Sequence, residues 1–266
     1  MYCILTLKVH GFLGFIISCM TDMRIIRGSK RAIFFDFGDT MALTKPSYLI
    51  RVAIAMRAAG YYVSDKDFEI AYLNTDYEIY KKYKAQGEMT TQEYVEWFFP
   101  ILCNHLSLEG DPYAIRAKIR KELREIKFIR KPLSGAVELL EFLKKRDFIL
   151  GIISNNDGRV EDKCDEVGIK EYFDIIADST NLGFIKPDAR IFHFVLDKLK
   201  LSPGEAIHVG DLYGSDVMGG LNAGLDVIWL NKRDIDRPDG IQVISVKNLS
   251  EIKTILDMEK TGFEHG

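Results

Sequence analysis

The chain contains little cysteine and little proline, with four cysteines and seven prolines among 266 residues. Cys3, Cys19, Cys103 and Cys164 lie far apart and form no CxxC pair. This spacing provides neither a disulfide framework nor a zinc site. It is typical of free thiols in a reducing compartment, so we expect a cytoplasmic protein.

The chain also lacks an excess of charge of one sign. Its net charge is -3, and lysines and acids are interleaved rather than gathered in runs. Without a basic excess we expect no nucleic-acid partner, and without a like-charge run we expect no charged tail. An apolar fraction of 47% in 266 residues is enough for a sizeable core in one domain or two. These patterns do not indicate an oligomeric state.

No apolar run is long enough to span a membrane. Tyr2–Met20 is mostly apolar, but its densest part, Gly11–Met20, is too short to cross a bilayer. Residues 1–22 therefore predict an N-terminal extension. It is either an over-long reading frame ahead of a start at Met20 or Met23, or an extra strand or helix on the core. A membrane anchor is the third alternative, and we expect no membrane partner.

The clearest strand, Ala32–Phe35, leads directly into the carboxylate of Asp36. This short aromatic and β-branched run is typical of a buried central strand in a parallel sheet. The carboxyl ends of such strands face the ligand crevice, so Asp36 is expected at its mouth. A carboxylate there is costly unless it is paired. On this stretch alone, Asp36 either caps a turn or serves a metal ion or catalysis.

Four helical patterns follow this strand. Ser64 with Asp67, and Thr90 with Glu93, resemble capping boxes, and Asp111 precedes a first-turn proline. The helices are expected at residues 47–59, 64–84, 94–106 and 112–126. We predict an all-helical block over residues 44–130. Its aromatic residues are expected to form the core of the block, although some could line a pocket facing Asp36; they are Tyr72, Tyr77, Tyr80, Trp97, Phe98 and Phe99.

From residue 132 onwards, strand and helix patterns alternate. Strands are expected at residues 148–153, 173–177, 206–209, 226–230 and 242–246. Helices are expected at residues 136–145, 160–167, 189–199, 216–223 and 249–259. This alternation predicts an α/β fold with a mostly parallel, doubly wound sheet. The predicted core comprises residues 23–43 and 131–266.

Polar residues follow three more strands or lie in nearby loops. They are Ser154 with Asn155, Lys186, and Asp211 with Asp216. Each has an ordinary structural explanation, such as a helix cap, a surface lysine or a turn. Gathered with Asp36 at one edge of a sheet, they fit phosphoryl transfer instead.

Each of these groups has a part in that chemistry. Asp36 can attack phosphorus to form an aspartyl-phosphate. Asp36, Asp211 and a backbone carbonyl offer the oxygen ligands that Mg²⁺ prefers. Lys186 offers a compact positive charge to phosphate oxygens, and Ser154 a hydrogen bond. Positioning and electrostatics would then carry most of the catalysis.

These residues resemble the motifs of the haloacid dehalogenase-like (HAD) hydrolase superfamily. The motifs appear in order as Asp36-Phe37-Gly38-Asp39-Thr40, then Ser154, then Lys186-Pro187, then Gly210-Asp211 through Asp216. The resemblance covers residues 31–260. It implies a Rossmann-like, three-layer core with a parallel sheet, and it identifies residues 44–130 as an inserted helical C1 cap.

The resemblance also implies roles for individual residues. Asp36 would be the nucleophile. A magnesium cofactor would be held by Asp36, the backbone carbonyl of Gly38 and Asp211, with Asp216 supporting. The substrate phosphate would be bound by Ser154, Asn155 and Lys186.

One position departs from the family pattern. Phosphatases of the family usually have an aspartate, acting as acid and base, where this chain has Gly38, and Asp39 follows it. Such acid–base help is typically worth about 10²- to 10⁴-fold in rate. We therefore expect slow turnover, a preference for good leaving groups, or use of Asp39 through a shifted turn.

The predicted function is a magnesium-dependent phosphatase that acts on a small phosphorylated metabolite through an aspartyl-phosphate. One alternative is a protein of the same fold that has lost most turnover and binds a ligand or partner. Another is a 2-haloacid dehalogenase, in which Asp36 would attack carbon. That branch typically has tyrosine at the position of Gly38, which makes it the less favoured alternative.

Overall fold

The computed structural model describes residues 29–236 and 238–261. The predicted extension at residues 1–22 lies outside them. Six parallel strands form the central sheet in the order β5-β4-β1-β6-β7-β8. They are β1 (Ala32–Phe35), β4 (Ile149–Ser154), β5 (Ile175–Asp178), β6 (Ala206–Gly210), β7 (Asp226–Leu230) and β8 (Ile244–Val246). The predicted α/β class is confirmed.

Strand β1 lies inside the sheet and pairs with β4 and β6. Its side chains alternate between two apolar clusters, so that Ile33 and Phe35 pack on one face while Ala32 and Phe34 pack on the other. All four are fully buried. Burial on both faces explains why the sequence of this strand is apolar throughout.

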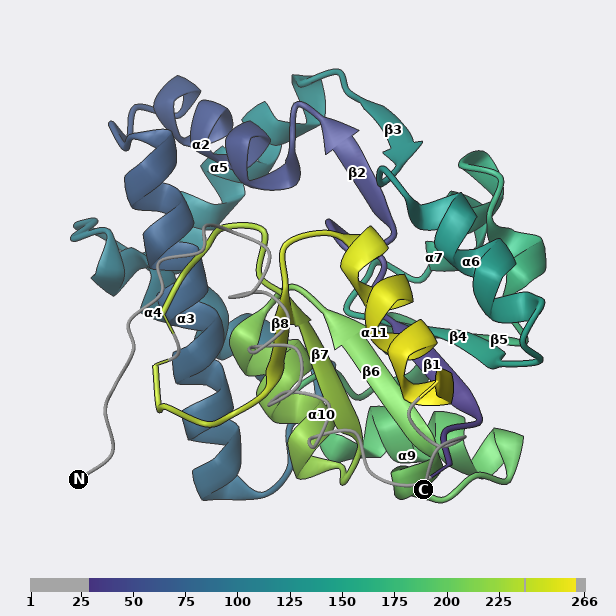
Figure 1. Cartoon of the computed structure of the whole chain (residues 1–266). Helices are drawn as coiled ribbons and strands as arrows, with labels where there is room; N and C mark the ends of the chain where they lie inside the picture. Colours follow the sequence, from purple (N-terminus) through teal and green to yellow (C-terminus); the bar gives the residue numbers. More distant parts are fainter. Residues whose placement is uncertain (1–28, 237, 262–266) are drawn as a thin grey trace, which may run out of the picture.

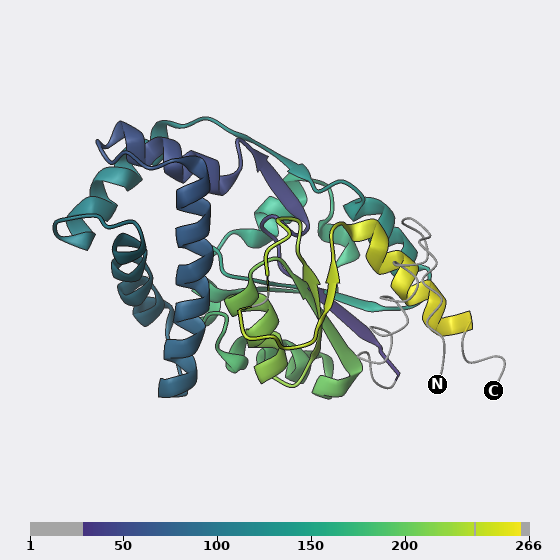
Figure 2. The ribbon, with the colours of Figure 1, turned by 60° about the vertical axis from the view of Figure 1, so that its left-hand side comes forward.

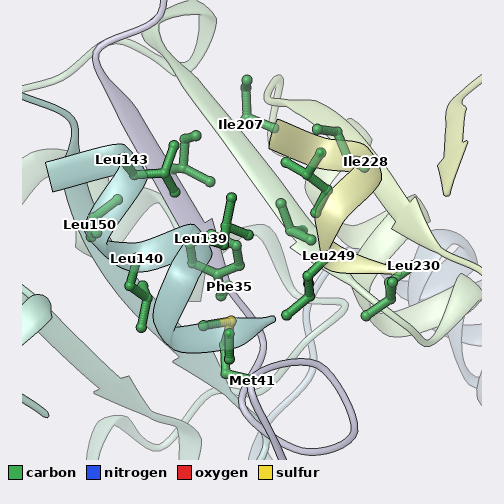
Figure 3. Close-up of a cluster of buried hydrophobic side chains, with 14 of the residues drawn as sticks. Phe35, Met41, Leu139, Leu140, Leu143, Leu150, Ile207, Ile228, Leu230 and Leu249 are labelled. Atoms are coloured by element: carbon green, nitrogen blue, oxygen red, sulfur yellow. The ribbon is translucent and has the colours of Figure 1, made fainter. Parts of the chain in front are cut away.

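Helices cover both faces of the sheet (Figure 1). On one face lie α6 (Ala136–Lys144), α7 (Val160–Glu166) and α11 (Leu249–Thr261). On the other lie α9 (Ala189–Leu199) and α10 (Gly219–Asn222). Figure 3 shows the leucines of α6 and Leu249 of α11 gathered around Phe35. Short turns of helix complete the core: η1 (Lys170–Tyr172), α8 (Ser179–Leu182), η2 (Pro203–Glu205) and η3 (Tyr213–Met218).

Four helices form a block beside the sheet (Figure 2). They are α2 (Tyr48–Ala58), α3 (Asp65–Gln86), α4 (Thr91–His105) and α5 (Pro112–Glu125), close to their predicted bounds. The capping box of Thr90 and Glu93 is present, and Ser64 accepts a hydrogen bond from the backbone of Asp67. In the described part of the chain, no helix has both the length and the apolar content needed to cross a bilayer.

Two short antiparallel strands connect the helical block to the core. They are β2 (Ala42–Lys45) and β3 (Ile129–Pro132), with Leu43 opposite Lys131. Neither strand was predicted, because each has only four residues and mixes polar with apolar side chains without a regular alternation. The predicted boundaries at 43/44 and 130/131 fall within this pair of strands.

The helix predicted at residues 216–223 has a different form. It begins at Tyr213 as a π-helical turn, η3, and continues as α10. The backbone N–H groups of Asp216 and Val217 both donate to the carbonyl of Leu212, and the Asp216 carboxylate accepts from the N–H of Leu212. Hydrophobic periodicity does not distinguish such a wider turn from an ordinary α-helical one, so it was not predicted.

The helical block contacts the core through Asp76 of α3. This carboxylate is 1% exposed and accepts hydrogen bonds from Gly214 N at 2.6 Å, from Ser215 N at 3.1 Å and from the Ser215 hydroxyl. A Cβ atom at Gly214 would lie 2.3 Å from the carbonyl oxygen of Asp76, so only glycine permits this approach. Burial raises the pKa of Asp76 to about 7, although these hydrogen bonds oppose the shift.

Asp76→Ala should destabilise the protein by about 2–4 kcal/mol, because it removes the buried acceptor of two backbone N–H groups. For a chain of this length the melting temperature should fall by about 5–10 °C, measured by differential scanning calorimetry. The matched control is Glu78→Ala on the same helix. Its carboxylate pairs with His105 at a partly exposed site, so little change is expected. Equal melting temperatures for the two variants would show that the buried contacts of Asp76 do not stabilise the protein.

Candidate active site

Asp36 and Lys186 meet at the carboxyl end of β1. The N–H of Asp36 donates to Val209 O at 2.9 Å, which extends the sheet pairing and holds Asp36 just beyond the strand. Lys186 is 1% exposed, and its Nζ lies 2.7 Å from Asp36 Oδ1 and 2.6 Å from Asp216 Oδ1. The structure therefore brings together three of the predicted site residues in one buried contact.

Asn155 holds the backbone of Lys186 in place. Its Nδ2 donates to Lys186 O and its Oδ1 accepts from Lys186 N, both at 2.9 Å. The amide that was predicted to bind substrate is thus already engaged with the lysine. Ser154, at the end of β4, is 2% exposed and lines the same cavity as Asp36.

Asp216 is held by three donors. Its Oδ1 faces Lys186 and lies 3.1 Å from His208 Nε2, while its Oδ2 accepts from Leu212 N at 3.0 Å. A Cβ atom at Gly210 would lie 2.2 Å from Asp216 Cγ, so the carboxylate needs a glycine beneath it. His208 was not among the predicted site residues. Its signal was a single polar residue in an otherwise apolar strand that ends in Gly-Asp.

Asp211 is tied to the loop that follows β7. Its Oδ2 lies 2.8 Å from Arg233 Nη1, and its Oδ1 accepts from the Thr40 hydroxyl at 3.3 Å. The same guanidinium donates through Nε to Glu69 of α3 at 2.7 Å, so Arg233 connects the acidic site to the helical block. Arg233 was also missed, because no strand end or motif distinguishes it from a surface arginine.

The site holds an excess of buried negative charge. Asp36, Asp211 and Asp216 each place a carboxylate oxygen within 4.8 Å of the others. Burial raises the pKa of Asp36 to about 7 even though Lys186 opposes the shift. Burial likewise raises the pKa of Asp211 despite Arg233. Burial acts in the same direction on Asp216, but Lys186 and His208 outweigh it and keep its pKa below the ordinary value.

This arrangement fits a hard divalent cation. Among the described residues, no hydrogen-bond donor occupies Oδ2 of Asp36, and only a hydroxyl contacts Oδ1 of Asp211. The donor set is entirely oxygen. Mg²⁺ prefers oxygen ligands, whereas softer metals favour nitrogen and sulfur. A cation here would also stabilise the ionised forms of these two carboxyls, which burial disfavours.

Asp39 adopts a left-handed backbone conformation with φ of 55°. Its carboxylate is 3.7 Å from Arg233 Nη2, and its carbonyl accepts from the Lys232 ammonium. It lines the same cavity as Asp36. The neighbouring Gly38 has free space, since a Cβ atom there would meet only Asp36 Oδ2 at 4.0 Å.

A cavity of about 700 Å³ lies over these residues, between the sheet edge and the helical block. Of the aromatic residues expected in the core of the block, Tyr72, Phe98 and Phe99 pack against its apolar cluster, as predicted, and they also line this cavity, as the alternative interpretation held. The others, Tyr77, Tyr80 and Trp97, pack in a cluster that includes Tyr213 and Trp229.

Comparisons with known proteins agree with this geometry. The family model of the haloacid dehalogenase-like hydrolases matches residues 30–224. Glyceraldehyde 3-phosphate phosphatase of Methanothermobacter thermautotrophicus is 27% identical over 85% of this chain and 99% of that protein. Pyrimidine 5'-nucleotidase YjjG of Escherichia coli is 34% identical over 47% of this chain, and the match spans just over half of that enzyme, 56%.

A solved structure extends the similarity to three dimensions. The HAD-hydrolase YfnB from Bacillus subtilis, bound to magnesium, superposes with a TM-score of 0.59 at 26% identity. The match covers 86% of this chain and all of that one. With its family model matched over most of its length, and with the predicted strand-end residues gathered at one edge of a parallel sheet, the chain belongs to the haloacid dehalogenase-like hydrolases.

Proposed function

We propose that this hydrolase is a magnesium-dependent phosphatase that acts on a small phosphorylated metabolite through a phosphorylated Asp36. The observation that carries the proposal is the buried carboxylate of Asp36, 2.7 Å from the Lys186 ammonium and within 4.8 Å of two further carboxylates. The relatives named as phosphatases support it.

In the first step, a carboxylate oxygen of Asp36 attacks phosphorus. The bond from phosphorus to the ester oxygen breaks, and the departing alcohol takes up a proton. Lys186 and Ser154 would hold the phosphoryl oxygens, and the lysine also favours the ionised form of the nucleophile. Asn155 acts here by fixing the lysine rather than by touching the substrate.

In the second step, water attacks the phosphorus of the aspartyl-phosphate. The bond between phosphorus and Asp36 breaks, inorganic phosphate leaves, and the water gives up a proton. Asp39 is the candidate for both proton transfers, because it lines the cavity. Its separation of 3.7 Å from Arg233 is longer than a hydrogen bond, which leaves its oxygens available.

The magnesium ion would be held by Asp36, the Gly38 carbonyl and Asp211. When bound, it would stabilise the charge on the transferring phosphoryl group. Asp216 has a supporting part, since its oxygens already serve Lys186, His208 and the Leu212 N–H. It keeps the lysine charged and directed at Asp36.

Asp36→Asn should lower the rate of phosphate release at least about 10³-fold, because an amide cannot replace the attacking carboxylate. The assay is phosphate release from a panel of sugar, nucleotide and aryl phosphates with Mg²⁺. The control is Asp174→Asn, a half-exposed carboxylate that pairs with Lys144 at the opposite end of β5. Full activity in Asp36→Asn would contradict the proposal. Halide release from 2-haloacids without phosphate release would indicate a dehalogenase instead.

Removal of Mg²⁺ with EDTA should abolish phosphate release, and added Mg²⁺ should restore it. Asp211→Asn should raise the Mg²⁺ concentration required at least about tenfold, because one charged ligand is lost. Binding is measured independently by the rise in melting temperature with Mg²⁺. If the wild type and Asp211→Asn respond to Mg²⁺ alike, Asp211 is not a ligand.

Gly38→Asp should raise kcat for alkyl phosphates by about 10²-fold or more, because it supplies an acid two residues after the nucleophile. A Cβ atom at Gly38 would make no close contact. Gly38→Ala tests the effect of the added carbon alone and should give no increase. Aryl phosphates with good leaving groups should gain less. Activity in Gly38→Asp with a silent wild type would instead favour the ligand-binding alternative.

A further inference from the structure

Three arginines of the helical block line the cavity beside the aromatic residues. Arg51 lies on α2, and Arg116 and Arg120 lie on α5. The two α5 arginines are four residues apart and therefore share one face of their helix. Figures 1 and 2 both place α2 and α5 together beyond β2, away from the strand ends that carry Asp36.

Among the described residues, no carboxylate lies within ion-pair distance of these arginines, although Asp39 attracts Arg51 from farther away. Other arginines form ion pairs with acidic side chains, but Arg51, Arg116 and Arg120 are in none of these pairs. Like charges four residues apart destabilise a helix, and Arg120 indeed lowers the pKa of Arg116, adding to the effect of burial. The α5 pair thus concentrates positive charge on the cavity wall.

Arg51 is the most constrained of the three. It is 8% exposed, its Nε has no hydrogen-bond partner, and its Nη2 reaches only the Thr44 hydroxyl at 3.4 Å. Its guanidinium packs 3.7 Å from the ring centre of Phe128. A buried guanidinium with an unused donor is costly unless something pairs with it. An anionic group bound in the cavity would accept a hydrogen bond from this donor and pair with the charge of Arg51.

The cavity therefore has a second positively charged region besides Lys186. Apolar rings, including those of Tyr72, Phe98 and Phe99, form much of the remaining wall. Arginine binds carboxylate and phosphate through paired N–H groups, whereas aromatic walls accept an apolar body. The two regions match a ligand with an anion at each end.

We propose that the substrate carries a second anionic group, a carboxylate or a second phosphoryl group, which binds to Arg51, Arg116 and Arg120. Its phosphate ester lies at the same time against Asp36 and Lys186. This inference rests on the proposed phosphatase function and narrows its substrate class to organic phosphates with two separate anionic groups.

The test measures binding of non-hydrolysable phosphonates by calorimetry in the presence of Mg²⁺. Each ligand has a phosphonate at one end, an alkyl chain of four to eight carbons, and a methyl, a carboxylate or a second phosphonate at the other end. In the wild type, the ligands with two anions should bind at least about tenfold more tightly than the methyl-terminated ligand of equal length. The relative affinity of carboxylate and phosphonate ends identifies the second group.

The variant Arg116→Met with Arg120→Met should bring this affinity ratio close to one. Both side chains are more exposed than Arg51, so the substitutions should be compatible with folding. Arg124→Met is the matched control. It lies on the same helix but is exposed and outside the cavity lining, so it should keep the wild-type ratio.

A wild-type ratio near one at every chain length overturns the inference, as does an unchanged ratio in the double variant. Failure of the phosphatase proposal has a different signature. In that case no phosphate is released from any substrate, whatever the phosphonates do. Phosphate release together with equal binding of all three ligand types would overturn only the second anionic group.

Discussion

The Lys186 ammonium, buried between Asp36 and Asp216, is the interaction on which the site depends. Lys186 is 1% exposed, and burial alone would lower its pKa and favour the neutral amine. Asp216 and Asp36 outweigh this effect and keep the lysine charged. The two carboxylates come from different segments, beyond β1 and within η3. Removal of either would leave a buried charge with one partner fewer. The lysine therefore joins the end of β1 to η3 as well as offering a positive charge to a substrate.

The parallel sheet makes this contact possible. Pairing of β1 with β6 places Asp36 and Asp211 beyond the ends of adjacent strands, and glycines bring the backbone close where side chains must cross. At Gly210, for example, the Asp216 carboxylate occupies the space that any larger residue would need. Burial at this edge is the main reason that the pKa values of Asp36 and Asp211 are raised, and the neighbouring acids add to it. An oxygen-binding cation is the natural complement to that charge.

Much of this could be predicted from the sequence, and the exceptions have physical reasons. Strands that are buried on both faces are apolar throughout, so they can be found in the sequence. The polar residues that follow them then mark the carboxyl ends of the sheet, where the site lies. Arg233 pairs with Asp211 across the strand β7, and no local pattern distinguishes it from a surface arginine. His208 lies only eight residues from Asp216, but which way its ring points within the strand is decided by packing. Strands β2 and β3 are too short to show alternation. The π-helical form of η3 lies in the pairing of the Val217 N–H with the Leu212 carbonyl, which leaves no mark on the hydrophobic period.

The helical block and the acidic site are linked by two contacts of different kinds. Asp76 of α3 binds the backbone of η3, the turn that carries Asp216, whereas Glu69 of the same helix shares Arg233 with Asp211. The first contact is buried. Its carboxylate has only hydrogen bonds to compensate for the loss of water, so the contact would be costly to break. The second is more exposed at Glu69, and without Glu69 the guanidinium of Arg233 would still have Asp211 as a partner. The position of α3 against the core is therefore set mainly by Asp76. Because η3 also carries Asp216, the packing of α3 bears through this turn on the carboxylate that holds Lys186.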